Sequence, residues 1–335
     1  MNKKRQVGLV FLCTVLASIL ASYVVEGLRT IVDNSFLLML VNQAILVLPS
    51  VLYIVASRMN LKDAIRLKKI SSSNVVLCII FSFLIMPLMN LINAISLLFS
   101  QNMIQAAISD IVDNNMLFLS VFVIALLPCV FEETIFRGVL YNEYRKSNVR
   151  IGIFLSAFLF GLMHQNFNQF SYAFAMGIVF AMLIEATDSI VSTMIVHFII
   201  NANSVIMTYL LPKLLDAIEK VGSKVEGYES VADTVVTKET ILSNMGYYVV
   251  SAIIASVLAY IVYKTIAQNA NRWEYVKSIF SKKARERMKD SNETLGLEVT
   301  EEEHGGIFTV SLMVGIILCL GLMVLTEIYV AQNGL

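Results

Sequence analysis

Long apolar runs separated by short polar connections occupy most of the chain. Each run approaches or exceeds the roughly 20 residues that an α-helix needs to cross the hydrocarbon core of a bilayer. The runs cover residues 7–25, 35–57, 75–99, 116–141, 149–164, 170–187, 189–211, 246–267 and 307–330. The run at 149–164 is the shortest. This pattern predicts an all-α, polytopic transmembrane helical bundle of eight or nine spans.

The apolar runs and the polar segments between them divide the chain into four parts. We expect N-terminal transmembrane helices over residues 1–115 and a central core over residues 116–211. An external loop follows at 212–245, with room for one short amphipathic helix. The last part, 246–335, contains two further transmembrane helices and, between them, a cytoplasmic loop at 268–306.

The composition excludes two broad classes of protein. Hydrophobic residues make up 57% of the chain and charged residues 15%, whereas soluble domains contain roughly 45–50% apolar and about 25% charged residues. Lys and Arg together number 25, as do Asp and Glu, so the net charge is zero. A soluble domain and a disordered chain are therefore excluded. No overall basic field is present that would bind nucleic acid.

The positions of the basic residues predict how the chain is oriented. With the N-terminus in the cytoplasm and the spans alternating, 20 of the 25 Lys and Arg residues fall in cytoplasmic segments. Cytoplasmic loops of membrane proteins are enriched in these residues. We therefore expect a multi-pass protein of the cell membrane, in contact with membrane lipid, with a cytoplasmic N-terminus and an external C-terminus.

Three charged residues lie well inside the fourth apolar run: Glu132, Glu133 and Arg137. A charge at this depth costs free energy, and such residues usually have a function. Glu133 and Arg137 are four residues apart, a spacing that places them on one helix face as an ion pair. Pairing would lessen the cost of burying both charges.

Two of the three histidines also fall inside apolar runs, His164 in the fifth and His197 in the seventh, and Asn201 follows one turn after His197. A helix rises about 1.5 Å per residue, so Glu132 lies about 24 Å and His164 about 22 Å from the predicted cytoplasmic edge. His197 is shallower, at about 12 Å, and helix tilt could bring it level. We expect these four side chains to line one water-accessible cavity inside the membrane.

These residue types point to a small set of chemistries. A carboxylate beside an imidazole can take a proton from water and pass it on. A second imidazole with a carboxamide can stabilise a developing oxyanion, so the set suits attack of water on an amide carbonyl. Two histidines and a glutamate also match the ligands of a catalytic zinc ion. A proton relay in a transporter and a purely structural set of polar contacts stay open as alternatives.

The spacing of these residues resembles three motifs of the CPBP family of intramembrane endopeptidases, which includes CAAX-processing proteases and bacteriocin-processing or immunity proteins. The motif EExxxR fits Glu132–Arg137, FxxxH fits Phe160–His164, and HxxxN fits His197–Asn201. All three occur in this order, each inside a predicted span. The resemblance covers about residues 116–210.

The resemblance implies a part in peptide hydrolysis for each of four residues. Glu132 would activate a water molecule, and His164 would share the proton transfer. His197 and Asn201 would stabilise the tetrahedral oxyanion.

The resemblance also implies supporting residues and raises the question of a metal. Glu133 and Arg137 would support the site from behind the reacting groups. We favour a site that works without a metal or other cofactor. If zinc were bound instead, its ligands would be Glu132, His164 and His197.

The leading hypothesis is an intramembrane endopeptidase of CAAX type that cleaves a membrane-associated protein or peptide with a glutamate-activated water. A bacterial leader peptide or a small membrane protein is favoured as substrate over a prenylated CAAX protein. The alternatives are a non-proteolytic immunity or scaffold protein of the same fold, and a proton-coupled transporter that uses Glu132 and the histidines.

Some nearby residues are expected to have structural parts only. Phe160 is predicted to pack in the apolar interior. Pro128 is expected to kink the fourth helix four residues before Glu132. Glu185 and Asp188 stand at the cytoplasmic end of the sixth run and are predicted to be solvated charges.

Overall fold

The computed structural model describes residues 3–58, 60–101, 104–222, 237–284, 286 and 306–333. Within these ranges all regular secondary structure is helical, and no strand occurs. Eight helical segments are long and apolar enough to span a membrane: α1 (Lys3–Arg29), α2 (Ser35–Ala56), α4 (Ser72–Leu97), the composite span (Leu117–Tyr144), α10 (Phe167–Thr187), α11 (Ile190–Gly222), α13 (Met245–Asn269) and α16 (Val310–Asn333). The predicted fold class is confirmed. The fifth predicted span corresponds to α9 (Val149–Leu162), which is apolar but has only 14 residues.

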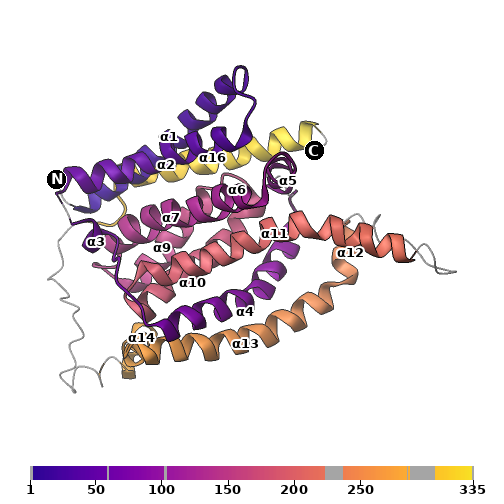
Figure 1. Ribbon diagram of the computed structural model, residues 1–335. Coiled ribbons are helices and arrows are strands. Elements are labelled where there is room, and N and C mark those ends of the chain that lie inside the picture. Colours follow the sequence, from indigo (N-terminus) through magenta and orange to yellow (C-terminus); the bar gives the residue numbers. More distant parts are fainter. Residues whose placement is uncertain are drawn as a thin grey trace.

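The long helices lie side by side in one bundle (Figure 1). Helices α4 and α13 pack together along one side, and α1 packs with α2 and α16 along the opposite side. The composite span, α10 and α11 lie between these two sides. Of the most apolar stretch of each helix, 56% is buried in α10 and 50% in the composite span, against 17% in α13. The three sequence motifs therefore lie on or beside the innermost helices of the bundle.

Four short helices lie at the two ends of the bundle. Helices α3 (Leu61–Ala64) and α14 (Trp273–Phe280) lie at the end where α1 begins, on the left in Figure 1. Helices α5 (Ile104–Asn114) and α12 (Lys238–Ser243) lie at the opposite end. Helix α14 is the described part of the predicted loop 268–306 that packs on the bundle, because one of its faces is buried.

Helix α11 continues past the point where the sequence predicts a loop to begin. It runs through Pro212 and ends at Gly222, eleven residues beyond the expected end of the span. The extension is polar and carries an ion pair one turn apart, between Lys220 Nζ and an oxygen of Asp216 at 2.6 Å. Such pairs favour helix over loop. Helix α12 matches the short helix expected in this segment, while residues 223–236, 285 and 287–305 lie outside the described residues.

The composite span is not one regular α-helix. It consists of α6 (Leu117–Val121), the π-helix η1 (Phe122–Leu126), α7 (Leu127–Glu133), the π-helix η2 (Thr134–Tyr141) and α8 (Asn142–Tyr144). π-helical turns are rare and are often found at functional sites. Every residue of η2 is buried.

The middle of η2 packs directly on the segment that follows α3. A Cβ atom added to Gly138 would lie 2.8 Å from Cγ2 of Ile65, closer than side chains approach one another. Asn142, just after η2, donates to the backbone carbonyl of Ala64 at 3.1 Å. The absence of a side chain at Gly138 therefore permits this close packing.

The prediction that Glu185 is a solvated charge is wrong. Its side chain is fully buried, and Nε and Nη2 of Arg145 each donate to one of its oxygens at 2.7 Å. Asp188 is also largely covered and pairs with Arg66 and Lys68. The reason is that cations from distant parts of the chain fold onto the end of α10, and a single apolar run does not reveal such partners.

Candidate active site

The two adjacent glutamates at the end of α7 have different surroundings. Glu133 and Arg137 form the ion pair that the sequence predicts, with 3.2 Å between Oε1 and Nη1 and both side chains fully buried. The side chain of Glu132 is 26% exposed. Of the two carboxylates, Glu132 is therefore the one that is not enclosed by the protein.

His197 joins the third motif to the first. It lies on α11, and its Nδ1 is 3.0 Å from Oε1 of Glu133. Its Nε2 is 3.9 Å from Oε2 of Glu132. A carboxylate oxygen only accepts hydrogen bonds, so Nδ1 carries the proton in this contact. The side chain of His197 thus lies between the two glutamates.

His197 lies near Glu132 although the sequence places the two residues at different depths in the membrane. That estimate assumed a regular α-helix from Glu132 to the end of the fourth span. Instead, η2 has wider turns closed by i→i+5 hydrogen bonds. The fourth span therefore advances less along its axis than α-helical counting assumes, which accounts for part of the estimated difference in depth.

The sequence predicts His164 inside the fifth helix, but the structure places it in the turn that follows α9. Helix α9 ends at Leu162, and Gln165 has a positive φ of 56°. Asn166 then caps α10 by accepting from the backbone of Gln169 at 2.8 Å. Nδ1 of His164 is 2.9 Å from the carbonyl of Phe160. Because a carbonyl can only accept, Nδ1 is the donor, and the neutral ring keeps Nε2 free as a base.

The ring of Phe160 connects the parts of the site. Cζ of Arg137 lies 4.2 Å from its centroid. The rings of His164 and His197 lie 5.0 and 6.2 Å from it. The sequence predicts packing for Phe160, and the structure adds that this ring contacts residues from all three motifs.

Phe180 on α10 is a site residue that the sequence does not reveal. Its ring stacks on His197 at 5.2 Å and lies 4.8 Å from Cζ of Arg137. The Arg137 guanidinium therefore has a phenyl ring of Phe160 and one of Phe180 as close neighbours, an arrangement that stabilises a buried cation. No spacing rule singles out Phe180 among the phenylalanines of the sixth run.

Asn201 reaches the composite span near its proline. Pro128 has no N–H and cannot donate to the carbonyl four residues before it, which belongs to Ile124. The Nδ2 of Asn201 donates to this carbonyl at 3.4 Å. The contact fixes α11 against η1 and leaves one N–H of the amide for another acceptor.

The donor atoms of a zinc site are only partly present. Both histidines use Nδ1 for a hydrogen bond and leave Nε2 free, as histidine ligands of metals do. Among the described residues, however, no three His, Cys, Asp or Glu side chains lie close enough together to hold a metal ion. As placed here, Glu132, His164 and His197 do not fit a zinc ion.

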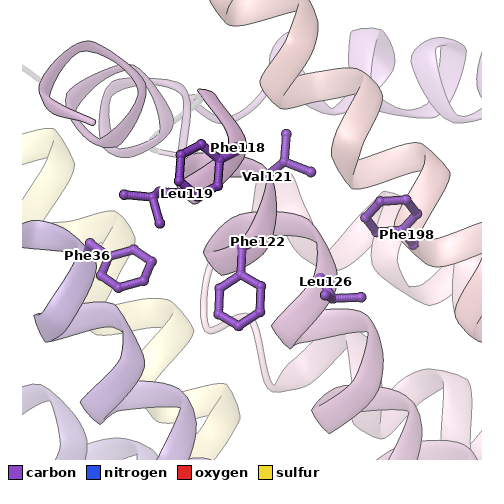
Figure 2. A pocket seen from close by; sticks show the side chains of 7 residues that line it. All are labelled: Phe36, Phe118, Leu119, Val121, Phe122, Leu126 and Phe198. Carbon is purple, nitrogen blue, oxygen red and sulfur yellow. The ribbon is translucent and has the colours of Figure 1, made fainter. Parts of the chain in front are cut away.

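An apolar pocket of about 430 Å³ lies beside the site (Figure 2). It is lined by Phe36, Phe118, Leu119, Val121, Phe122, Leu126 and Phe198. Phe198 follows His197 and is one turn from Asn201, so the pocket adjoins α11 at the level of the site. The water-accessible cavity around Glu132 stays a prediction.

Comparison with known proteins identifies the central part of the chain. No curated protein and no solved structure matches it. The matching family model is described as Type II CAAX prenyl endopeptidase Rce1-like, and the match spans residues 114–203 and contains all three motifs. The predicted resemblance to the CPBP family is thereby confirmed for about a quarter of the chain. Residues 114–203 are therefore similar to the type II CAAX prenyl endopeptidase family, Rce1-like.

Proposed function

We propose that the protein is an intramembrane endopeptidase that hydrolyses a peptide bond in a membrane-associated protein or peptide. One observation carries this proposal. A partly exposed carboxylate, Glu132, lies beside an imidazole whose other nitrogen is held by the buried Glu133. The family match of the same segment supports it.

In the proposed reaction, Glu132 takes a proton from water, and the hydroxide attacks the carbonyl carbon of the substrate amide. The carbonyl π electrons move to oxygen and form a tetrahedral oxyanion. Glu132 then returns the proton to the amide nitrogen, the C–N bond breaks, and the oxyanion collapses to a carboxyl group. His164, with Nε2 free, shares the proton transfer.

His197 and Asn201 stabilise the oxyanion in this proposal. Glu133 accepts from Nδ1 and stabilises the doubly protonated ring, so that Nε2–H is directed to the side of Glu132. The free N–H of Asn201 adds a second donor. Donors that are already oriented are effective because they need no reorganisation during the reaction. Arg137 keeps Glu133 ionised and in place.

The proposed site works without a metal, and the substrate comes from the membrane. The family description names a CAAX prenyl endopeptidase, so a prenylated CAAX protein is one candidate substrate. The sequence favours a leader peptide or a small membrane protein, and bacteriocin processing is one such role. The N-terminus is proposed to be cytoplasmic, as the distribution of Lys and Arg predicts.

Comparison of new protein termini tests the function. Cells that produce the wild-type chain are compared by mass spectrometry with cells that produce Glu132→Ala at equal abundance. Glu26→Ala is the matched control, because Glu26 is exposed at the end of α1. Termini present with the wild type and the control, but missing with Glu132→Ala, establish proteolysis and name the substrates.

Equal termini in all three samples would contradict the proposal. A scaffold or immunity protein then predicts that function in the host survives Glu132→Ala. A transporter predicts proton-coupled uptake into vesicles that is lost in the same variant.

A further inference from the structure

A second cluster of charged residues lies at the end of the bundle formed by α3 and α14. Its centre is Glu185, fully buried near the end of α10. Two nitrogens of Arg145 donate to it, as do the hydroxyls of Tyr141 at 2.5 Å and Tyr275 at 2.6 Å. We name this group the Glu185 cluster. Its members are Arg66, Tyr141, Arg145, Glu185, Asp188, Arg272 and Tyr275.

The outer members of the cluster add positive charge. Nε of Arg272 donates to the backbone carbonyl of Glu185 at 2.7 Å. Arg66 pairs with Asp188 and lies 3.9 Å from Oε1 of Glu185. Burial, together with the nearby Arg145, lowers the pKa of Arg66 to about 10, and at that value the guanidinium stays charged at neutral pH. Three arginines thus surround the Glu185 carboxylate, and its removal would leave them facing one another.

The cluster is joined to the proposed active site through η2. Arg137 and Tyr141 both lie on this π-helix, one turn apart. Arg137 is bound to the buried carboxylate of Glu133, and Tyr141 to that of Glu185. π-helical turns are rare in proteins, so contacts outside the helix must favour this one. The two carboxylates thus bind side chains that lie one turn apart on η2.

The same contacts tie η2 to α10, the helix whose Phe180 stacks on His197. Glu185 lies on α10, five residues after Phe180, whose ring stacks on His197. Glu185 therefore holds the far end of η2 against α10, while Glu133 holds its near end against His197 on α11. Movement of η2 along α10 would change the distance between Glu133 and His197.

We infer that Glu185 is a positioning residue, which fixes η2 so that Glu133 and Arg137 hold His197 in place. The kinetic part of this inference rests on the proposed function. Tyr275 and Arg272 extend the support to α14 and to the end of α13, which lie outside the matched segment 114–203. The C-terminal part of the chain thereby contributes to the site without touching it.

The test uses the full-length protein in detergent with ¹³C-labelled histidine. The chain has three histidines, so substitution of His164 and of His304 assigns the ring signal of His197. The variant is Glu185→Gln, which keeps the shape of the side chain and removes its charge. Asn74→Ala is the matched control, because Asn74 is buried at the same end of the bundle, and its hydrogen bonds within the described residues join it to Ser71, Ile266 and Asn269 rather than to η2 or His197.

We expect Glu185→Gln to displace or broaden the His197 ring signal, and Asn74→Ala to leave it unchanged. With a farnesylated CAAX peptide that carries a fluorophore and a quencher as probe, kcat should fall about tenfold, the effect of roughly 1.4 kcal/mol on the barrier. KM should change less than twofold, because substrate contacts are intact. Tyr275→Phe removes a single hydrogen bond and should move the signal in the same direction, by less.

An unchanged His197 signal in folded Glu185→Gln overturns the inference. If that variant does not fold, an unchanged signal in Tyr275→Phe does the same. A signal that moves equally in Asn74→Ala assigns the effect to general loosening and also overturns it. If the wild type does not cleave the peptide, the proposed function is in question, but the histidine signal still decides whether Glu185 positions the site.

Discussion

Two buried carboxylates on the inner helices each bind an arginine: Glu133 binds Arg137 within the composite span, and Glu185 binds Arg145 directly after it. Their surroundings nevertheless differ. Each oxygen of Glu185 accepts at least two hydrogen bonds from its neighbours. Among the described residues, Oε2 of Glu133 and all three guanidinium nitrogens of Arg137 are buried without a hydrogen-bond partner. Stable structural clusters satisfy their polar atoms, and sites of chemistry often do not. At the outer edge of the Glu185 cluster, Nη1 of Arg66 and Oδ1 of Asp188 also lack a hydrogen-bond partner within the described ranges. The comparison therefore concerns the two carboxylates: that of Glu185 is fully hydrogen-bonded, as in a structural support, and that of Glu133 is not.

The largest effect should come from the exposed neighbour of the Glu133 pair. Glu132→Gln removes the base but keeps the size of the side chain, so kcat should fall about 10²–10⁴-fold while the free energy of unfolding stays nearly unchanged. Steady-state kinetics and SDS titration measure the two quantities. If the free energy of unfolding fell together with kcat, Glu132 would support the fold, and its surroundings would resemble those of Glu133 more closely.

Breaking the Glu133 pair should cost much stability. Arg137→Met removes the cation from the buried Glu133 carboxylate and leaves it the contact with His197. Removal of one partner of a buried ion pair destabilises proteins by about 3–5 kcal/mol. The double variant Glu133→Gln with Arg137→Met removes both charges and should recover a large part of this loss without recovering cleavage. If the double variant is as unstable as the single one, the pair contributes by packing and not by charge.

A milder substitution, Arg145→Lys, tests the hydrogen bonds of the Glu185 carboxylate. Arg145→Lys keeps the charge but cannot bind both oxygens of Glu185 side by side. Loss of one charge-assisted hydrogen bond should lower the free energy of unfolding by about 1.5–3 kcal/mol. Chemical denaturation of the wild type and the variant gives this difference. A change below the measurement error would show that the cluster tolerates a missing bond and is less tightly built than its contacts indicate.

The aromatic contact at the site should have a smaller effect. Phe160→Leu keeps an apolar side chain and removes the ring that Arg137 and both histidines touch. The lost cation–π contact is worth about 0.5–2 kcal/mol, so stability should fall modestly. Phe158→Leu is the control, since Phe158 packs on Phe170 and Phe174 away from the histidines. A drop in kcat with Phe160→Leu alone would assign the ring to the site.

The smallest expected effect concerns metal. A chelator such as 1,10-phenanthroline should leave cleavage unchanged, and the purified protein should contain less than one zinc ion per chain. The reason is the lack of three converging ligands among the described residues. Inhibition that added zinc reverses would show that Glu132, His164 and His197 move together to bind an ion.

The sequence predicts the spans well because membrane insertion depends on local hydropathy. All nine predicted runs correspond to helical segments; their ends differ, and the fourth contains π-helical turns. The Glu133–Arg137 pair is also local, since its partners are four residues apart. The turn at His164 was missed because the apolar run continues through it, and only the backbone at Gln165 reveals the break.

Contacts between distant parts of the chain could not be predicted in this way. The partners of Glu185 lie 40, 44 and 90 residues away, and nothing in the run that contains it indicates that they converge. The same holds for Phe180, which becomes a neighbour of His197 only after α10 and α11 pack. The π-helical turns of the composite span also depend on such contacts, because no local composition rule encodes them.

The close approach of Gly138 to Ile65 bears on how the matched segment can be exchanged between proteins. Any larger residue at 138 would collide with Ile65, which lies outside residues 114–203. A chimera that receives residues 114–203 alone therefore contains the surface around Gly138 but lacks the Ile65 segment that packs on it. Grafts that carry residues 64–68 along with the segment should fold, and grafts without them should need compensating changes at both positions.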